Sequence, residues 1–229
     1  MILGIDISVA QPVNSIDWAR ATSEGGVQFA YLRQGYGTHT DPRFVDHLTA
    51  ARAASQIPIG AYQFALVDAD PCDEARQFCS DVGGLDLELP PVLDLETKNN
   101  ASPQQILDWT RQWIAEVLEQ LGRKPLLYTG PSFWTSLGLA AAAPEWAEIP
   151  LWIANYGVST PHIPPPWTTW TIWQFAANTI WQLGSAQKWG PTCPGPGWRK
   201  VASAHEVPGI TGEVDCDWFA GSIDRLVAA

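Results

Sequence analysis

Short apolar segments alternate with helical patterns along the first two thirds of the chain. Eight segments have the composition and length of strands: residues 2–8, 27–34, 57–66, 89–96, 124–130, 149–156, 169–176 and 212–219. Several of them are continuously apolar, which is typical of strands covered on both faces, as in parallel sheets. The pattern therefore predicts an α/β protein.

Helical patterns separate the first five of these strands. They follow Ser15, open at Asp41, Asp70 and Ser102, and in a weaker form span about 131–147. Capping residues and Pro mark helix starts, and Gly25-Gly26 and Gly122 mark two of the ends. The second helix should bury Phe44, Val45, Leu48 and Ala51, and the fourth should bury a stripe that includes Leu118.

After residue 150 the helical patterns disappear, and loops rich in Pro, Gly and Trp join the last three strands. Eight strands with helices after only the first five predict a closed, TIM-like barrel that is incomplete in its last third. No linker of the kind that separates domains is visible, so residues 1–229 are expected to form one domain. The long segment 178–206 exceeds a plain connection, and it is either a substrate-contacting loop or a surface flap.

Acidic residues follow the apolar part of several strands. Asp94 and Glu96 end the segment "LPPVLDLE", and because side chains at i and i+2 of a strand share a face, the two should project together. Asp6 in "GIDIS" and Asp215 and Asp217 in "EVDCDWF" have similar positions. In a barrel of this class the carboxyl ends of the strands carry the chemistry. We therefore expect three or four carboxyl groups to meet at one mouth.

Crowded carboxyl groups have two chemical uses that the sequence can suggest. Their mutual repulsion raises at least one pKa, and a protonated acid beside an ionised one is the pair that glycoside cleavage needs. Clustered acids also bind magnesium or calcium. A single strand-end Asp, by contrast, is more often a helix cap or a loop hydrogen bonder. The four His, at 39, 47, 162 and 205, are not in strand-end patterns, so we expect them at the surface or in loops.

Composition narrows the classes of partner. A net charge of −11 and a pI near 4.6 argue against duplex nucleic acid, which needs Lys and Arg to replace counterions. No apolar run approaches the length of a membrane span, and no export leader precedes the first strand, so we expect a soluble chain. Thirteen Trp serve either core packing or stacking on sugar faces.

The four Cys do not form a disulfide scaffold or a zinc spacing. Cys72 and Cys79 are too far apart on one helix to bridge, and we interpret both as small core residues. Cys193 and Cys216 can pair only if a loop folds over the last strand.

Ordered motifs along nearly the whole chain carry a resemblance to a known family. They are "GIDISVAQP", "IDWARA", "DPRFVDHLTAARAA", "IPIGAYQF", "PPVLDLE", "KPLLYTGPSFW", "PLWIANY", "WTIWQF" and "VPGITGEVDCDWF". With these motifs the chain resembles the glycoside hydrolase family 25 lysozymes, the Chalaropsis-type muramidases. The resemblance implies a (β/α)5β3 barrel that hydrolyses the β-1,4 bond between N-acetylmuramic acid and N-acetylglucosamine in bacterial peptidoglycan, with no metal and no cofactor.

The same resemblance assigns roles by position. Glu96 takes the proton donor's place, and Asp94 that of its partner, which orients the substrate's acetamido group or stabilises the cation. Asp6 and Asp215 match the other two acids of the groove. Tyr62, Trp152 and Gln174 fall on segments that line the groove, with barrel packing as the alternative interpretation. The family is thought to retain configuration; whether the nucleophile is a carboxylate or the acetamide stays open.

Three segments depart from the family pattern. Gln63 stands where His is common, "RQGYG" at 33–37 replaces K-x-[ST]-E-G, and "VDCDWF" replaces V-D-L-N-x-F. None of these changes removes an acid assigned to catalysis, although they alter groove shape or supporting hydrogen bonds.

Two other functions compete with a muramidase: a catalytically inactive barrel that binds wall glycan, and a metal-dependent hydrolase whose activity excess EDTA would abolish. We expect a monomer that acts at the bacterial cell wall, either extracellular or delivered by a phage from the host cytoplasm.

Overall fold

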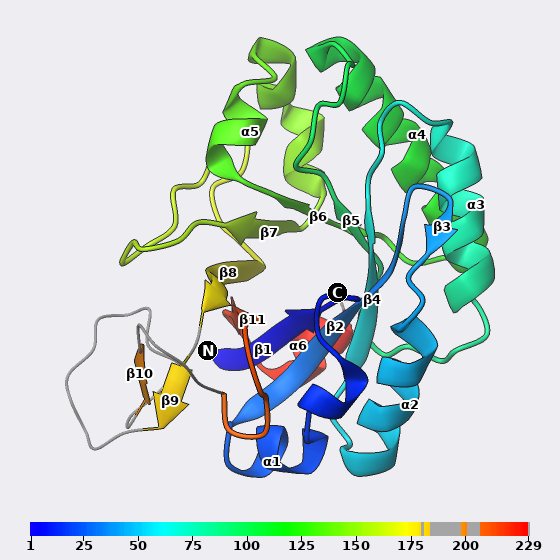
Figure 1. The fold of residues 1–229 in the computed structure, drawn as a ribbon. Helices are drawn as coiled ribbons and strands as arrows, with labels where there is room; N and C mark the ends of the chain where they lie inside the picture. The colour runs from blue at the N-terminus through cyan, green and yellow to red at the C-terminus, as the bar shows by residue number, and fades with distance from the viewer. Residues whose placement is uncertain (180, 184–197, 201–206, 229) are drawn as a thin grey trace.

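The strands predicted from the sequence close into a barrel in the computed structural model, which describes residues 1–179, 181–183, 198–200 and 207–228 (Figure 1). Within these residues the barrel consists of β1 (Ile2–Ile7), β2 (Val27–Tyr36), β4 (Ile59–Phe64), β5 (Val92–Asp94), β6 (Leu126–Thr129), β7 (Leu151–Ala154), β8 (Ile172–Thr179) and β11 (Val214–Phe219). Neighbouring strands are parallel along the series β1, β2, β4, β5, β6, β7 and β8. Strand β11 runs antiparallel to both β8 and β1 and closes the ring.

Among the parallel strands of the described part of the chain, the first five are each followed by a helix and the last two are not. These helices are α1 (Trp18–Ser23), α2 (Phe44–Ala54), α3 (Pro71–Val82), α4 (Pro103–Leu121) and α5 (Pro131–Thr135). The smaller elements are η1 (Val13–Ser15), β3 (His39–Thr40), η2 (Leu139–Ala142), η3 (Pro144–Glu148), β9 (Trp181–Leu183), β10 (Trp198–Lys200) and α6 (Ile223–Val227). This order confirms the predicted (β/α)5β3 barrel.

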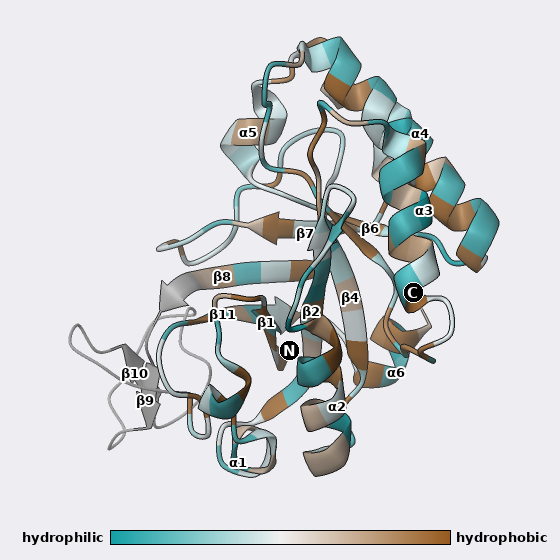
Figure 2. Ribbon diagram, turned by 45° about the vertical axis from the view of Figure 1, so that its right-hand side comes forward, coloured by the Kyte–Doolittle hydropathy of each residue, from teal (hydrophilic) through white to brown (hydrophobic). Residues whose placement is uncertain are grey.

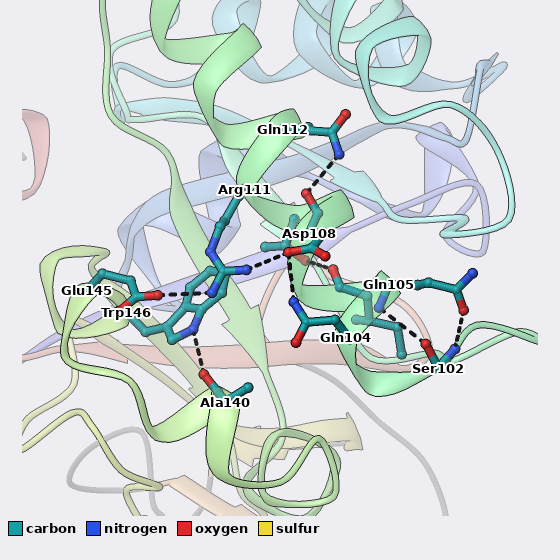
Figure 3. A network of polar contacts seen from close by, with 11 residues as sticks. Ser102, Gln104, Gln105, Asp108, Arg111, Gln112, Ala140, Glu145 and Trp146 are labelled. Carbon is teal, nitrogen blue, oxygen red and sulfur yellow. Dashed lines mark hydrogen bonds and ion pairs between the residues drawn. The ribbon is translucent and has the colours of Figure 1, made fainter.

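Local sequence explains the two best-defined helices. The Asp70 side chain caps α3 by accepting from the backbone N–H groups of Cys72 and Asp73. Ser102 and Gln105 form a reciprocal capping box at the start of α4, which ends at Gly122 in the left-handed conformation. Figure 3 shows this cap beside the contact that joins α4 to η3, where Arg111 bridges acidic residues of both segments and lies over the Trp146 ring.

Two predicted helices differ in their bounds. The second begins at Phe44, three residues after Asp41, because residues 41–44 form a turn before the helix. Asp41 Oδ1 and its carbonyl oxygen accept from the N–H groups of Arg43 and Phe44, whereas Oδ2 accepts from Val9 N–H and pairs with Arg33. The segment 131–147 is divided into α5, η2 and η3, because Gly138 has φ +82° and Pro144 starts a new turn.

Two layers of apolar side chains stabilise the barrel. Aromatic residues fill its interior, and Gly4 and Gly60 leave room for them, since a Cβ there would lie within 2.2 Å of the Phe29 and Tyr31 rings. The second layer packs between strands and helices, and α3 and α4 alternate hydrophobic and hydrophilic residues as amphipathic helices do (Figure 2). No helix in the described part of the chain is long and apolar enough to cross a bilayer.

The exposure of several side chains differs from the prediction. Val45 and Leu118 were expected on buried helix faces, but 60% and 42% of their surfaces are exposed because both faces turn to solvent. His47 was expected at the surface, but it is buried, with Nε2 against the Gln11 carbonyl oxygen. Cys79 is buried as predicted, whereas Cys72 is half-buried.

Core packing accounts for most of the Trp residues that the structure describes. Those buried are Trp18, Trp109, Trp113, Trp134, Trp146, Trp152, Trp167, Trp173 and Trp218. The packing interpretation therefore holds for this set. Cys193, His205 and most of the loop predicted at 178–206 lie outside the described residues. Cys216 is a buried free thiol on β11.

Candidate active site

A pocket of about 200 Å³ opens at the carboxyl ends of the parallel strands. Its walls come from most of the barrel strands and consist of Asp6, Ser8, Arg33, Tyr62, Phe64, Val92, Asp94, Glu96, Tyr128, Trp152, Gln174 and Asp215. The structure thus brings all seven residues predicted for the site into one pocket. A second cavity near the amino ends of the strands, lined by residues such as Asp86, Leu89 and Arg123, has no such collection of acids.

Strand topology explains how acids from the two ends of the chain meet. Asp6 stands near the end of β1 and is paired in register with Asp215, because antiparallel β11 begins where β1 ends. Asp94 is the last residue of β5, and Glu96 lies two residues further on, past the end of the strand. The Asp6 and Asp94 side chains are buried, Asp215 is half-buried and Glu96 is exposed.

Burial and mutual repulsion shape the acidity of this cluster. Burial is the main cause that raises the pKa of Asp94 well above its usual value, followed by the charges of Glu96 and Asp6. The pKa of Asp6 is raised in the same way by burial and by Asp215. Glu96 is exposed on one side, but partial desolvation by the pocket wall, and then Asp215, still raise its pKa. The cluster therefore holds protons at a pH where isolated carboxyl groups have lost them.

Gln174 is the centre of a hydrogen-bond network that fixes Asp6. Its Nε2 donates to Asp6 Oδ2 at 2.6 Å, and its Oε1 accepts from the hydroxyl groups of Tyr128 at 2.8 Å and Tyr156 at 2.5 Å. The two hydroxyl groups determine which way the amide points, so that its N–H faces the acid.

Trp152 and Tyr62 both pack inside the barrel and line the pocket. The Trp152 ring is almost fully buried, packs 4.8 Å from Tyr31 and 5.5 Å from Tyr128, and still forms part of the pocket wall. Tyr62 is buried beside Asp6 and Asp94, where desolvation raises the pKa of its hydroxyl well above the usual value. Barrel packing and lining of the pocket are therefore compatible at both positions.

Sequence reasoning missed three polar side chains of the site. Arg33 is the one cation among the described residues that line the pocket, and its Nε pairs with Asp41 Oδ2 at 2.9 Å. Tyr128 and Tyr156, which hold Gln174, were also missed. Tyr128 and Tyr156 stand at strand ends, in "KPLLYTG" and "PLWIANY", so the signal that identified the acids applied to them as well, whereas Arg33 lies within β2.

Gln63, which stands where the family commonly has His, lies behind the pocket wall. Gln63 is fully buried, accepts from Trp113 Nε1 at 2.8 Å and donates to the Gly37 carbonyl oxygen. Next to it, burial raises the pKa of Glu74 to about 8. This departure therefore changes a supporting network beneath the loops and not the lining of the pocket.

The described residues contain no group of three or more His, Cys, Asp or Glu side chains arranged to hold a metal ion. A parallel barrel whose mouth collects acids with raised pKa values, together with aromatic and amide groups, has the features of a glycoside hydrolase.

Comparison with known families identifies the class more closely. The profile described as "Glycosyl hydrolases family 25" matches residues 5–182. The chain belongs to this family and is a glycosidase.

Known proteins similar to the chain include lysozymes and muramidases. Lysozyme M1 of Streptomyces globisporus is 31% identical over 243 residues, which cover 99% of this chain and 70% of that protein. The N,O-diacetylmuramidase of Chalaropsis sp. is 32% identical over 187 residues, covering 76% of this chain and 87% of that protein.

Solved structures show the same fold. The bacterial lysozyme from Streptomyces coelicolor superposes with a TM-score of 0.77 at 30% identity, covering 99% of this chain and 95% of that one. A muramidase from Acremonium alcalophilum gives a TM-score of 0.77 at 27% identity, covering 100% and 98%.

Proposed function

We propose that the chain is an N-acetylmuramidase that cleaves the β-1,4 bond between N-acetylmuramic acid and N-acetylglucosamine, with Glu96 as the proton donor. Family membership and the similarity to lysozymes and N,O-diacetylmuramidases support a peptidoglycan-cleaving enzyme. The observation that carries the assignment of residues is the meeting of Asp6, Asp94, Glu96 and Asp215 in one pocket.

Glu96 is suited to protonate the leaving oxygen. It is the exposed acid of the cluster, so it can reach the glycosidic bond and recover its proton from solvent after each turnover. Its raised pKa keeps the proton on the carboxyl group at a pH where an ordinary Glu would be ionised. Activity should therefore fall as the pH rises through this raised value.

Asp94 is suited to hold the sugar that becomes cationic. Its carboxyl lines the pocket two residues from Glu96, and its Oδ1 has no hydrogen-bond donor among the described residues. The N–H of the substrate's acetamido group is a donor of the right chemistry, and negative charge at Asp94 would stabilise the oxocarbenium-like transition state. Asp6 and Asp215 complete the negative field on the far side of the pocket.

Tyr62, Trp152 and Gln174 form the remaining polar and aromatic contacts for the glycan. Flat rings suit the apolar faces of pyranose sugars, and Gln174 presents an amide already oriented by two tyrosines. We propose that residues 1–229 form a single catalytic domain and act as a monomer. It would meet its substrate outside the cytoplasm, after export or after phage-mediated release.

Clearing of purified bacterial walls tests the proposal. Glu96→Gln should lose at least about 100-fold in the rate of clearing, because the amide cannot donate the proton. Glu119→Gln makes the same chemical change at an exposed position of α4 and should clear walls at the parental rate.

Wall pelleting separates the enzyme from the inactive glycan-binding barrel. We expect Glu96→Gln to co-sediment with walls as the parent does. A parent that sediments with walls but never clears them would favour the binding barrel, and unchanged clearing by Glu96→Gln would refute the assignment of the proton donor.

A further inference from the structure

Asp217 is a buried acid below the pocket that the proposed mechanism does not use. It follows Asp215 by two residues on β11 and shares its face, but β11 runs inward from the mouth, so Asp217 lies deeper in the barrel, level with Gly4 and Gln174. None of its surface is exposed. A carboxylate in such a place must either have strong donors or carry a proton.

The hydrogen bonds of Asp217 are incomplete for an ionised carboxylate. Oδ1 accepts from Trp152 Nε1 at 3.0 Å, whereas Oδ2 has no N–H or O–H donor from other described residues. The remaining neighbour within hydrogen-bonding reach is the Asp6 carboxyl group. Two ionised carboxylates repel at that range, so the contact needs a proton on one of them.

The surroundings decide which acid carries that proton. The titratable groups around Asp217 are Asp6 on β1, Tyr31 on β2, and Asp215 and Cys216 on its own strand; β7 and β8 contribute the neutral Trp152 and Gln174. These neighbours are acidic or neutral and do not stabilise a second negative charge. Each acid receives one N–H, Asp217 from Trp152 and Asp6 from Gln174, but of the two it is Asp6 that lies at the wall of the pocket, where solvent can stabilise its charge.

We propose that Asp217 is a positioning residue that keeps its proton at the pH of catalysis and donates it from Oδ2 to Asp6. Burial, and then the charges of Asp6 and Asp215, raise its pKa well above the usual range, which agrees with this arrangement. Asp6 is thereby held from two sides, by an amide and by a carboxylic acid. It stays an oriented carboxylate facing the substrate, a role that rests on the muramidase function proposed above.

Replacement by Asn is the sharpest test, because the amide has the shape of a protonated carboxyl group and donates at every pH. Asp217→Asn should keep kcat/KM for wall fragments within about threefold of the parent, with an unchanged pH profile. Asp217→Ala removes the donor and should lower kcat at least tenfold with little change in KM, provided circular dichroism shows that it is folded. A large loss in Asp217→Asn, or a shifted pH profile, would overturn the proposal.

Infrared difference spectra read the proton directly and without any substrate. The parent-minus-Asp217→Asn spectrum at neutral pH should contain the carbonyl stretch of a protonated carboxyl group, since the other acids are common to both proteins and cancel. Absence of this band refutes the assignment even if the parent clears walls. If the parent shows this band but does not clear walls, the proton assignment to Asp217 stands and the proposed enzymatic function is refuted instead.

Discussion

Glu74→Gln should remove a pH-dependent loss of stability that a buried carboxyl group imposes on the fold. Glu74 lies on α3 with none of its surface exposed. Its Oε2 accepts only long hydrogen bonds, from Leu66 N–H at 3.4 Å and Gln63 Nε2 at 3.5 Å, and Oε1 has no donor among the described residues. Desolvation therefore raises its pKa to about 8.

The size of the effect follows from proton linkage. A carboxyl group with a pKa of about 8 in the folded state and 4.5 in the unfolded state binds its proton more tightly when folded. Stability is then greatest below pH 4.5 and falls as the pH rises through this window. Between pH 5 and pH 8 the loss from this one group amounts to roughly 3–4 kcal/mol.

Urea unfolding at intervals from pH 5 to pH 8 measures the loss. Gln at position 74 has the shape of the protonated acid and does not titrate, so the free energy of unfolding of Glu74→Gln relative to the parent should rise by that amount across the range. The acids of the pocket also lower stability with rising pH, but they are present in both proteins and drop out of the difference. Glu119→Gln, at an exposed site, should follow the parent. If the curves of Glu74→Gln and the parent ran parallel, the raised pKa would be wrong.

Two further substitutions test the site and the fold. Asp215→Asn removes the charge that helps raise the pKa of Glu96, so the alkaline limb of the pH–activity profile should move to lower pH by on the order of half to one unit, whatever happens to the maximum rate. A limb that stays in place would show that Asp215 does not act on the proton donor. Ser102→Ala breaks the capping box of α4 and should lower the free energy of unfolding by about 1 kcal/mol in urea melts, with clearing activity unchanged below the transition.

The alternation of strands and helices was predictable from the sequence because it depends on local patterns. Continuous apolar runs, capping residues such as Asp70 and Ser102, and terminal glycines gave the order of the elements and the barrel. The start of α2 was not predictable, because Asp41 closes a turn before the helix through Oδ1, while its Oδ2 bonds to Val9 and Arg33 outside the helix. The exposure of Val45 and Leu118 likewise depends on how far each helix face extends beyond the barrel.

Part of the site was predictable for a related reason. Alternation along a strand identifies which acids share a face, and it placed Asp94 with Glu96 and Asp215 with Asp217. It does not give the depth of a residue, which depends on the direction of the strand. Because β11 is antiparallel, Asp217 lies inside the barrel, at a place where the family pattern has a neutral Asn. The apolar and polar pattern of residues 212–219 does not indicate that this strand pairs antiparallel.

The order of burial among the acids gives each one a separate use. Asp217 is fully buried, Asp6 and Asp94 have 6% and 8% of their surfaces exposed, Asp215 is half-buried, and Glu96 is open to solvent. A proton donor has to exchange protons with water in every catalytic cycle, which suits only the outermost position. Acids further in exchange protons less readily and serve better as fixed charges or fixed donors. Because burial sets both the pKa and the access to water, the depth of an acid in this barrel predicts its role, and bringing Asp217 to the mouth would require β11 to run in the opposite direction.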